Sequence, residues 1–145
     1  MFSQLIFAAL LITTTVVIHA VVQERLIELL EWVSPKLGTI FGTMWKIPVT
    51  VIAVMGILFA LIIEMWLWAL FLYATNEGLH SVETALYFSA STFTTLGFGD
   101  IVLTPQWRLL ASFEATNGLL LFGWSTAFLF EVISNIYRND KISGA

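Results

Sequence analysis

Three long runs of apolar residues, separated by shorter polar stretches, dominate the sequence. They are Leu5–Val22, Ile47–Tyr73 and Trp107–Ile136. At 1.5 Å per residue, the first run would rise about 27 Å as a helix and the second about 40 Å. The hydrocarbon core of a bilayer is about 30 Å thick, so each run is long enough to cross it. The pattern therefore predicts three membrane-spanning helices.

The polar residues between the first two runs indicate a segment at the membrane surface. In residues 22–33, apolar residues recur at helical spacing and three glutamates share the opposite side, which is typical of an interfacial helix. We expect the helix to end at Pro35, because the residue before a proline is pushed out of the helical conformation. Residues 36–48 mix lysine with aromatic residues, as expected at the headgroups.

A short helix is expected between the second and third runs. Residues 76–80 supply a polar turn, and Ser81 can cap a helix that ends near Phe93 and is too short to span. The stretch Ser91–Asp100, STFTTLGFGD, follows with two glycines and three threonines. The resulting order is span, short helix, irregular segment, span.

Composition supports a membrane protein and argues against several classes of function. Hydrophobic residues make up 59% of the chain and charged residues 11%, with a mean hydropathy of +0.91. The net charge of -4 offers no basic patch for nucleic acid. There are no cysteines, and the two histidines are far apart, so no disulfide and no histidine metal site is expected. The acids are scattered over separate runs, which argues against an enzyme.

Non-helical backbone inside a membrane leaves N–H and C=O groups unpaired unless protein or a water-filled cavity surrounds them. A permeating cation compensates the carbonyls if they point at it. Glycine reaches positive φ without steric cost, so Gly97 and Gly99, alternating with Leu96 and Phe98, allow consecutive carbonyls to align. Thr95 can add a hydroxyl oxygen at the inner end.

Residues 92–100, TFTTLGFGD, resemble the potassium-channel signature whose core is TVGYG. The resemblance covers roughly Ile47–Ile136. It implies an all-α integral membrane protein with an outer helix, a pore helix, a selectivity filter and an inner helix, to which this chain adds an N-terminal transmembrane helix. Because one chain supplies a single filter strand, it also implies a homotetrameric pore in the lipid bilayer.

The family resemblance implies roles for the filter residues. The permeant potassium ion would be held by the carbonyls of Thr95, Leu96, Gly97 and Phe98 and by the Thr95 hydroxyl. Gly99 would complete the outer turn, and Asp100 would stand at the outer mouth. Leu96 replaces the usual valine and Phe98 the usual tyrosine, whose hydroxyl ties the filter to its pore helix in many relatives. No organic cofactor is implied.

The residues expected to support the filter lie on the short helix and the third run. Tyr87 and Ser91, one turn apart, can hydrogen-bond behind the filter or to Asp100, and Tyr87 can equally be an interface aromatic residue. Glu114 can buttress the short helix through Thr92 or Ser91, or be a protonated acid at a subunit contact.

The residues expected to gate the pore lie further along the third run. Gly118 matches the hinge glycine of the family, with close helix packing as the alternative, and Gly123 is expected to pack. Four Phe122 or Phe130 rings at one level would make a hydrophobic constriction. Among the remaining polar residues, Glu64 is expected to face water or a neighbouring helix, and His19 to be packed or interfacial.

Lysine and arginine fall mainly between the first two runs and after the third, so the filter is expected to face outside and the C-terminus the cytoplasm. Small chains of this layout occur in bacteria, which implies the inner membrane. The expected divisions are residues 1–46 for the N-terminal helix and interfacial segment, 47–138 for the pore domain and 139–145 for a short cytoplasmic tail. No cationic residue occurs in the first 24 positions, which argues against a cleaved secretory signal.

The sequence favours a potassium-selective channel subunit that conducts passively. Two alternatives remain open: a non-selective monovalent cation channel, and a non-conducting subunit that assembles with a partner. No run carries arginine at every third position, so no voltage-sensing helix is expected.

Overall fold

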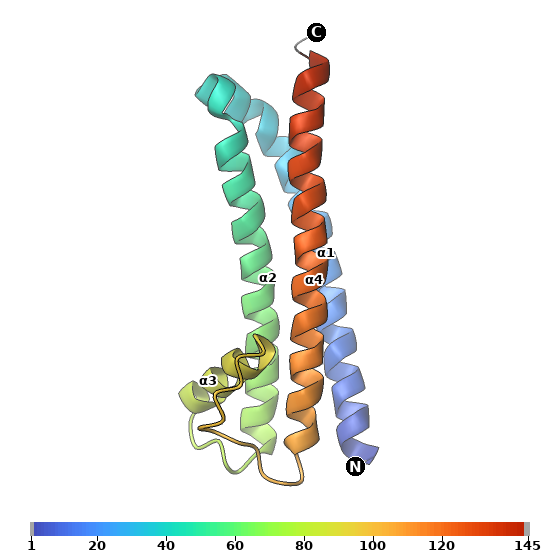
Figure 1. The fold of residues 1–145 in the computed structure, drawn as a ribbon, viewed down its shortest axis with the longest axis vertical. Helices are drawn as coiled ribbons and strands as arrows, with labels where there is room; N and C mark the ends of the chain where they lie inside the picture. Colours follow the sequence, from blue (N-terminus) through green and yellow to red (C-terminus); the bar gives the residue numbers. More distant parts are fainter. Residues whose placement is uncertain (1, 144–145) are drawn as a thin grey trace.

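A computed structural model describes residues 2–143, which are almost entirely helical (Figure 1). The elements in chain order are α1 (Phe2–Phe41), the 3-10 turn η1 (Gly42–Met44), α2 (Lys46–Thr75), α3 (Val82–Phe93) and α4 (Arg108–Ser143). Nothing is described for the side chains beyond residue 138.

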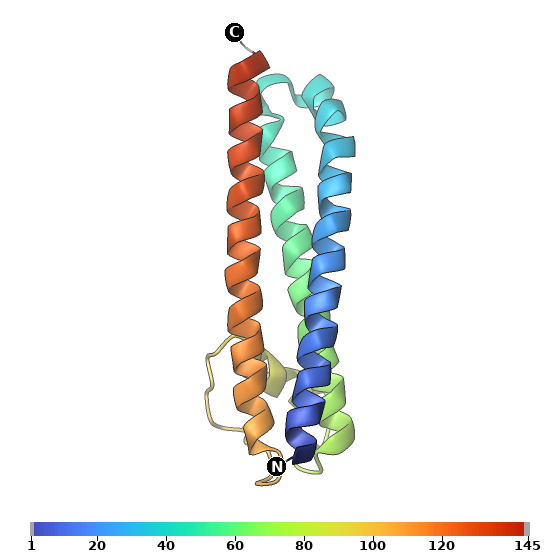
Figure 2. The same cartoon turned by 90° about the vertical axis from the view of Figure 1, so that its right-hand side faces the viewer.

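Three segments are long and apolar enough to cross a membrane, the same number of candidate spans as predicted. They are Phe2–Met44, Lys46–Thr75 and Arg108–Arg138. The long helices α1, α2 and α4 run alongside one another, and α3 lies against α2 near the end that carries the N-terminus (Figure 1 and Figure 2). The loop from α3 returns to α4 at that same end, so the irregular segment sits at one end of a three-helix bundle.

The prediction that the first helix ends at Pro35 is wrong, because α1 continues through this residue to Phe41. Proline removes one helical hydrogen bond. Near this point, the Ser34 hydroxyl donates to the Leu30 carbonyl at 2.5 Å. The helix ends instead before Gly42, whose φ is 54°. Glycine is the residue that most readily takes this left-handed conformation at the end of a helix.

The boundaries of the other helices lie close to those expected. The Ser81 hydroxyl caps α3 by accepting a hydrogen bond from the Thr84 N–H at 3.1 Å, as predicted. Before it, the Asn76 side chain accepts from the Gly78 N–H at 3.0 Å and closes the polar turn. The helix α4 runs past the expected end at Ile136 to Ser143, and residues 144–145 of the expected tail lie outside the described residues.

The helices pack through one face each and leave apolar side chains on the outside. Trp68 and Leu72 of α2, Phe93 of α3 and Leu110 of α4 are completely buried. The buried residues of α1 follow a helical spacing along its whole apolar part: Gln4, Ala8, Leu11, Thr15, His19, Gln23, Leu26 and Leu30. The exposed faces are rich in leucine, isoleucine, valine and phenylalanine, as expected of helices in contact with lipid.

Candidate functional site

The segment that follows α3 has an alternating backbone conformation. Thr95, Gly97 and Gly99 have φ values of 62°, 55° and 78°. The two glycines adopt positive φ as predicted, since they lack the side chain that disfavours it. Thr95 is the one non-glycine residue with positive φ in the part of the chain that the structure describes, and this was not foreseen. Every second residue from 95 to 99 therefore takes the left-handed conformation.

Two main-chain hydrogen bonds tie the inner half of this segment to the end of α3. The Gly97 N–H donates to the Ser91 carbonyl, and the Thr95 N–H to the Thr92 carbonyl, both at 2.9 Å. The Ser91 hydroxyl donates to the Phe88 carbonyl within α3 instead of reaching the segment. Ser91 thus supports the segment through its main-chain oxygen.

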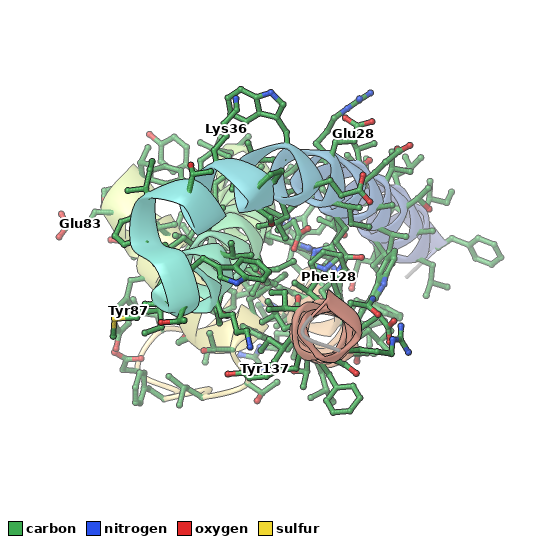
Figure 3. All side chains as sticks on the ribbon, turned by 90° about the horizontal axis from the view of Figure 1, so that it is seen from above. Glu28, Lys36, Glu83, Tyr87, Phe128 and Tyr137 are labelled. Carbon is green, nitrogen blue, oxygen red and sulfur yellow. The ribbon has the colours of Figure 1, made fainter. Side chains whose placement is uncertain are left out.

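Tyr87 holds the outer half of the segment in two ways. Its hydroxyl donates to the Asp100 carboxylate at 2.8 Å, one of the contacts that the sequence suggested. Its ring also stacks on the Phe98 ring, with centroids 6.3 Å apart and planes at 14°. Seen end-on, Tyr87 projects from α3 on the side of the bundle away from α4 (Figure 3). A contact from the short helix thus reaches this segment although position 98 has no hydroxyl.

We expect Tyr87→Phe to weaken the outer half of the segment without unfolding the protein. The variant loses the hydrogen bond to Asp100 and keeps the ring that stacks on Phe98. The measurement is the rate of hydrogen exchange at the main-chain amides of residues 96–100 of the protein in lipid, and we expect this rate to rise a few-fold. Tyr73→Phe, at a tyrosine that is 42% exposed on α2, is the matched control and should leave the rate unchanged.

The pH dependence of this contact follows from its donor. The hydrogen bond to Asp100 raises the pKa of the Tyr87 phenol above its ordinary value of 10.0. The neutral phenol is the donor, so the bond is complete below that ordinary value and is lost only as the pH rises through the raised pKa. The ratio of the measured rate in Tyr87→Phe to that in the natural protein should therefore be constant from about pH 7 to about pH 9.

Glu114 lies behind α3 and contacts it through a residue that the sequence did not indicate. Its carboxyl group accepts a hydrogen bond from the Ser89 hydroxyl at 2.5 Å, so the predicted partners Thr92 and Ser91 are wrong. The Ser89 hydroxyl also lies 2.9 Å from the Met65 carbonyl of α2. Both Glu114 and Ser89 are fully buried. The Ser89 hydroxyl therefore links α2, α3 and α4 at one point.

Gly118 of α4 lies directly against the end of α3. A Cβ atom placed on it would stand 2.0 Å from the Phe93 carbonyl oxygen. Phe122, one turn further on, packs its ring against the Phe93 ring with centroids 6.0 Å apart. These two residues therefore act as packing partners of α3, and the predicted gating roles of Gly118 and Phe122 stay predictions. Within the single chain, no described atom lies within 4 Å of a Cβ placed on Gly123, so the packing expected of this residue stays a prediction.

Polar residues of α1 pair with α2 and α4, which the sequence did not foresee. His19 Nδ1 lies 2.8 Å from Glu64 Oε1, and both side chains are completely buried. Glu64 thus faces a neighbouring helix, one of the two expectations. The Asn117 amide donates to the Thr15 hydroxyl at 2.9 Å. The sequence held one indication of these contacts: polar residues recur one helical turn apart, at positions 15, 19 and 23, in and directly after the first apolar run.

No group of three or more histidine, cysteine, aspartate or glutamate side chains that could hold a metal ion occurs among the described residues. Main-chain and hydroxyl oxygens are the other ligands that a monovalent cation accepts. Residues 95–100 are exposed, and Leu96 and Phe98 are each 64% exposed in the single chain. The oxygens of this segment are therefore not enclosed by the chain to which they belong.

Comparison with known proteins identifies the family. The family model described as "Ion channel" matches residues 60–135, just over half of the chain. The chain belongs to the ion channel family. The matched part contains the second half of α2, all of α3, the alternating segment and most of α4, whereas α1 lies outside it.

One curated relative matches part of this ion channel. The mouse protein named delayed-rectifier potassium channel regulatory subunit KCNS1 is 31% identical over 67 residues. The alignment covers 46% of this chain and 14% of the mouse protein, so the two share one limited segment. No solved structure matches the chain.

Proposed function

We propose that this ion channel chain is one subunit of a homotetrameric, potassium-selective pore that conducts passively. The observation that carries the proposal is the alternation of positive φ at Thr95, Gly97 and Gly99. Residues of positive and negative φ in alternation can turn successive peptide units the same way, so that their carbonyls can line one side of the strand. The membership of the ion channel family and the similarity to a potassium channel subunit support this reading.

In this proposal, the ion exchanges its water for oxygens of the main chain. The carbonyls of Thr95, Leu96, Gly97 and Phe98 and the Thr95 hydroxyl replace the hydration shell, as rings of carbonyls do in potassium channels. Gly99 provides the last left-handed residue before Asp100 at the outer mouth. The discrimination between ions depends on how firmly the strand is held. The bonds from Ser91 and Tyr87 supply part of that support.

Four copies are needed, because one strand cannot encircle an ion. The exposure of residues 95–100 in the single chain fits a strand that faces three identical strands across an axis. The C-terminal end of α3, at Phe93, comes directly before the strand. The negative end of its helix dipole would favour a cation in the cavity below the filter.

We assign the gate of this pore to Phe130. Its side chain is 73% exposed on α4, whereas Phe122 packs against Phe93. Four Phe130 rings at one level would make an apolar constriction that blocks ions by dewetting. Gly118 keeps the proposed hinge role only if its contact with Phe93 opens during gating.

The proposed orientation puts the filter outside and the C-terminus in the cytoplasm, in a bacterial inner membrane. The junction of α1 and α2 lies at the end of the bundle opposite to α3 (Figure 1), and Lys36, near the end of α1, and Lys46, at the start of α2, flank that junction. Positive residues favour the cytoplasmic side of a membrane, which supports this orientation.

The decisive experiment measures ion flux through the purified chain in lipid vesicles. We expect potassium to pass at least about tenfold faster than sodium, a difference of about 1.4 kcal/mol in the barrier. Equal fluxes would favour the non-selective cation channel. Cross-linking of the same sample should give four chains per particle, and a monomer would overturn the proposal.

A second candidate function is that of a non-conducting subunit, because the similar mouse protein is named a regulatory subunit. Its prediction is the opposite: the purified chain alone carries no current, and co-assembly with a conducting channel changes the current of that channel. Single-channel recording of the purified chain separates the two.

A further inference from the structure

The helix α1 is bonded to the pore-lining helix by a buried polar contact that neither conduction nor lipid anchoring requires. His19 contacts two helices at once: Nδ1 lies 2.8 Å from Glu64 Oε1 of α2, and Nε2 lies 3.2 Å from Ser125 Oγ of α4. One turn earlier on α1, Thr15 accepts the hydrogen bond from Asn117. We call these five residues the α1 seam.

Every member of the α1 seam is buried. The relative exposures of Thr15, His19 and Glu64 are 0%, that of Asn117 is 1% and that of Ser125 is 4%. Polar and ionisable side chains are rare inside membranes, and where they occur they pair with one another and mark function. A helix that served only as an anchor would be equally well built from apolar residues. The polar residues of α1 therefore point to a role in the channel itself.

The α1 seam reaches α4 on both sides of Gly118. Asn117 directly precedes this glycine, which packs on Phe93 at the end of α3. Ser125 lies about two helical turns beyond it. Any shift of α4 relative to α1 and α2 must therefore break or re-form the contacts of His19 and Thr15. The seam joins residues that are 45, 102 and 106 positions apart in the chain, so it fixes the relative position of three helices.

We propose that His19 is a positioning residue that holds α4 against α2, so that α1 sets the equilibrium between the open and closed positions of the pore-lining helix. This inference rests on the proposed channel function. The imidazole acts through its two ring nitrogens: Nδ1 contacts Glu64 of α2, and Nε2 contacts Ser125 of α4. Of the titratable groups on the elements packed here, Glu64 of α2 faces His19, and Glu114 of α4 is bonded to Ser89 of α3.

The test compares variants that remove the contacts with one that can keep them. His19→Leu and Ser125→Ala each remove the contact between His19 and Ser125, one of the two that join α1 to α4 in the seam. We expect either to shift the open probability by about tenfold, equivalent to about 1.4 kcal/mol, without changing single-channel conductance. Because both substitutions remove the same contact, the double variant should shift the open probability no further than His19→Leu alone. His19→Gln can still hydrogen-bond to both partners and should restore most of the natural open probability.

A matched pair of threonines provides the control. Thr15→Ala removes the acceptor of the Asn117 hydrogen bond, whereas Thr14→Ala changes an exposed threonine that bonds only to the Leu10 carbonyl of its own helix. Thr15→Ala should shift the open probability and Thr14→Ala should not. If all the seam variants open as the natural channel does, or if the shifts of His19→Leu and Ser125→Ala add, the inference is wrong.

A second measurement does not depend on conduction. The chain has no cysteine, so Ala127→Cys on α4 introduces a single thiol at an exposed small residue. We expect its rate of modification by a methanethiosulfonate reagent to change at least about fivefold when His19→Leu is added, because α4 is then released from α1. An unchanged rate overturns the inference. If the natural chain carries no current but His19→Leu still changes the modification rate, the proposed function is wrong and the inference about α1 stands.

Discussion

Gly118→Ala is expected to abolish potassium flux. The added Cβ would stand 2.0 Å from the carbonyl oxygen and 2.8 Å from the carbonyl carbon of Phe93. These are main-chain atoms, so they cannot rotate away as the end of a side chain can. Overpacking a tight contact costs about 1–3 kcal/mol and sometimes more. Here the strain falls on the residue that ends α3, two positions before Thr95. Flux from vesicles and the fraction of assembled tetramer measure the effect.

Gly123→Ala is the matched control for this prediction. It makes the same change in the same helix, at a position where no described atom lies within 4 Å of the new Cβ. Alanine is also the better helix former by about 1 kcal/mol. The control should therefore conduct and assemble like the natural chain. If Gly118→Ala assembled and selected potassium normally but opened less often, the hinge role of Gly118 would be favoured over packing against Phe93.

The elements of the fold could be predicted because each depends on local composition. The length of an apolar run decides whether a helix can span, and a serine before a helical pattern marks where α3 begins. Likewise, Gly97 and Gly99 predicted positive φ without any knowledge of their neighbours. The positive φ of Thr95 could not be predicted in this way, because threonine seldom adopts it unless surrounding contacts impose it.

The end of α1 shows where a local rule failed. Proline predicted a break at residue 35, because it removes a helical hydrogen bond and its ring crowds the carbonyl four residues earlier, at a cost of about 3 kcal/mol or more. The helix continues because side chains on both sides of the proline pack against the other helices. Leu30 before the proline is buried and Leu37 after it packs against the core. The break occurs at Gly42, where the conformation of the glycine itself ends the helix.

The contacts of the candidate site with the other helices could not be read from the sequence. Glu114 was recognised as a buried acid that needs a partner, yet three hydroxyl residues of α3 lie within one turn, and helix rotation decides which of them faces it. The partner is Ser89. The pairing of His19 with Glu64 depends in the same way on how α1 docks against α2. The spacing of polar residues within one helix predicts which face is polar, but it does not predict which residue of a neighbouring helix contacts that face.

Glu114→Ala should also cause a large loss of function. The carboxyl accepts the hydrogen bond of Ser89, whose hydroxyl also lies against the Met65 carbonyl, so the glutamate helps hold α3 between α2 and α4. Removing one partner of a buried hydrogen bond costs about 1–3 kcal/mol. The cavity left by the side chain adds to that cost. We expect the selectivity for potassium over sodium to fall about tenfold or more, measured as the ratio of the two fluxes.

The same substitution at Glu131 controls for the loss of a charge from α4. The Glu131 side chain is 65% exposed and bonds to Asn135 of its own helix, so Glu131→Ala disturbs no contact with α3. It should leave the flux ratio unchanged. Glu114→Gln can still accept the Ser89 hydrogen bond, so it should fall between the natural chain and Glu114→Ala. A flux ratio that fell equally in Glu131→Ala would show that selectivity depends on the carboxyl groups of α4 in general, and not on the support that Glu114 gives to α3 before the proposed filter.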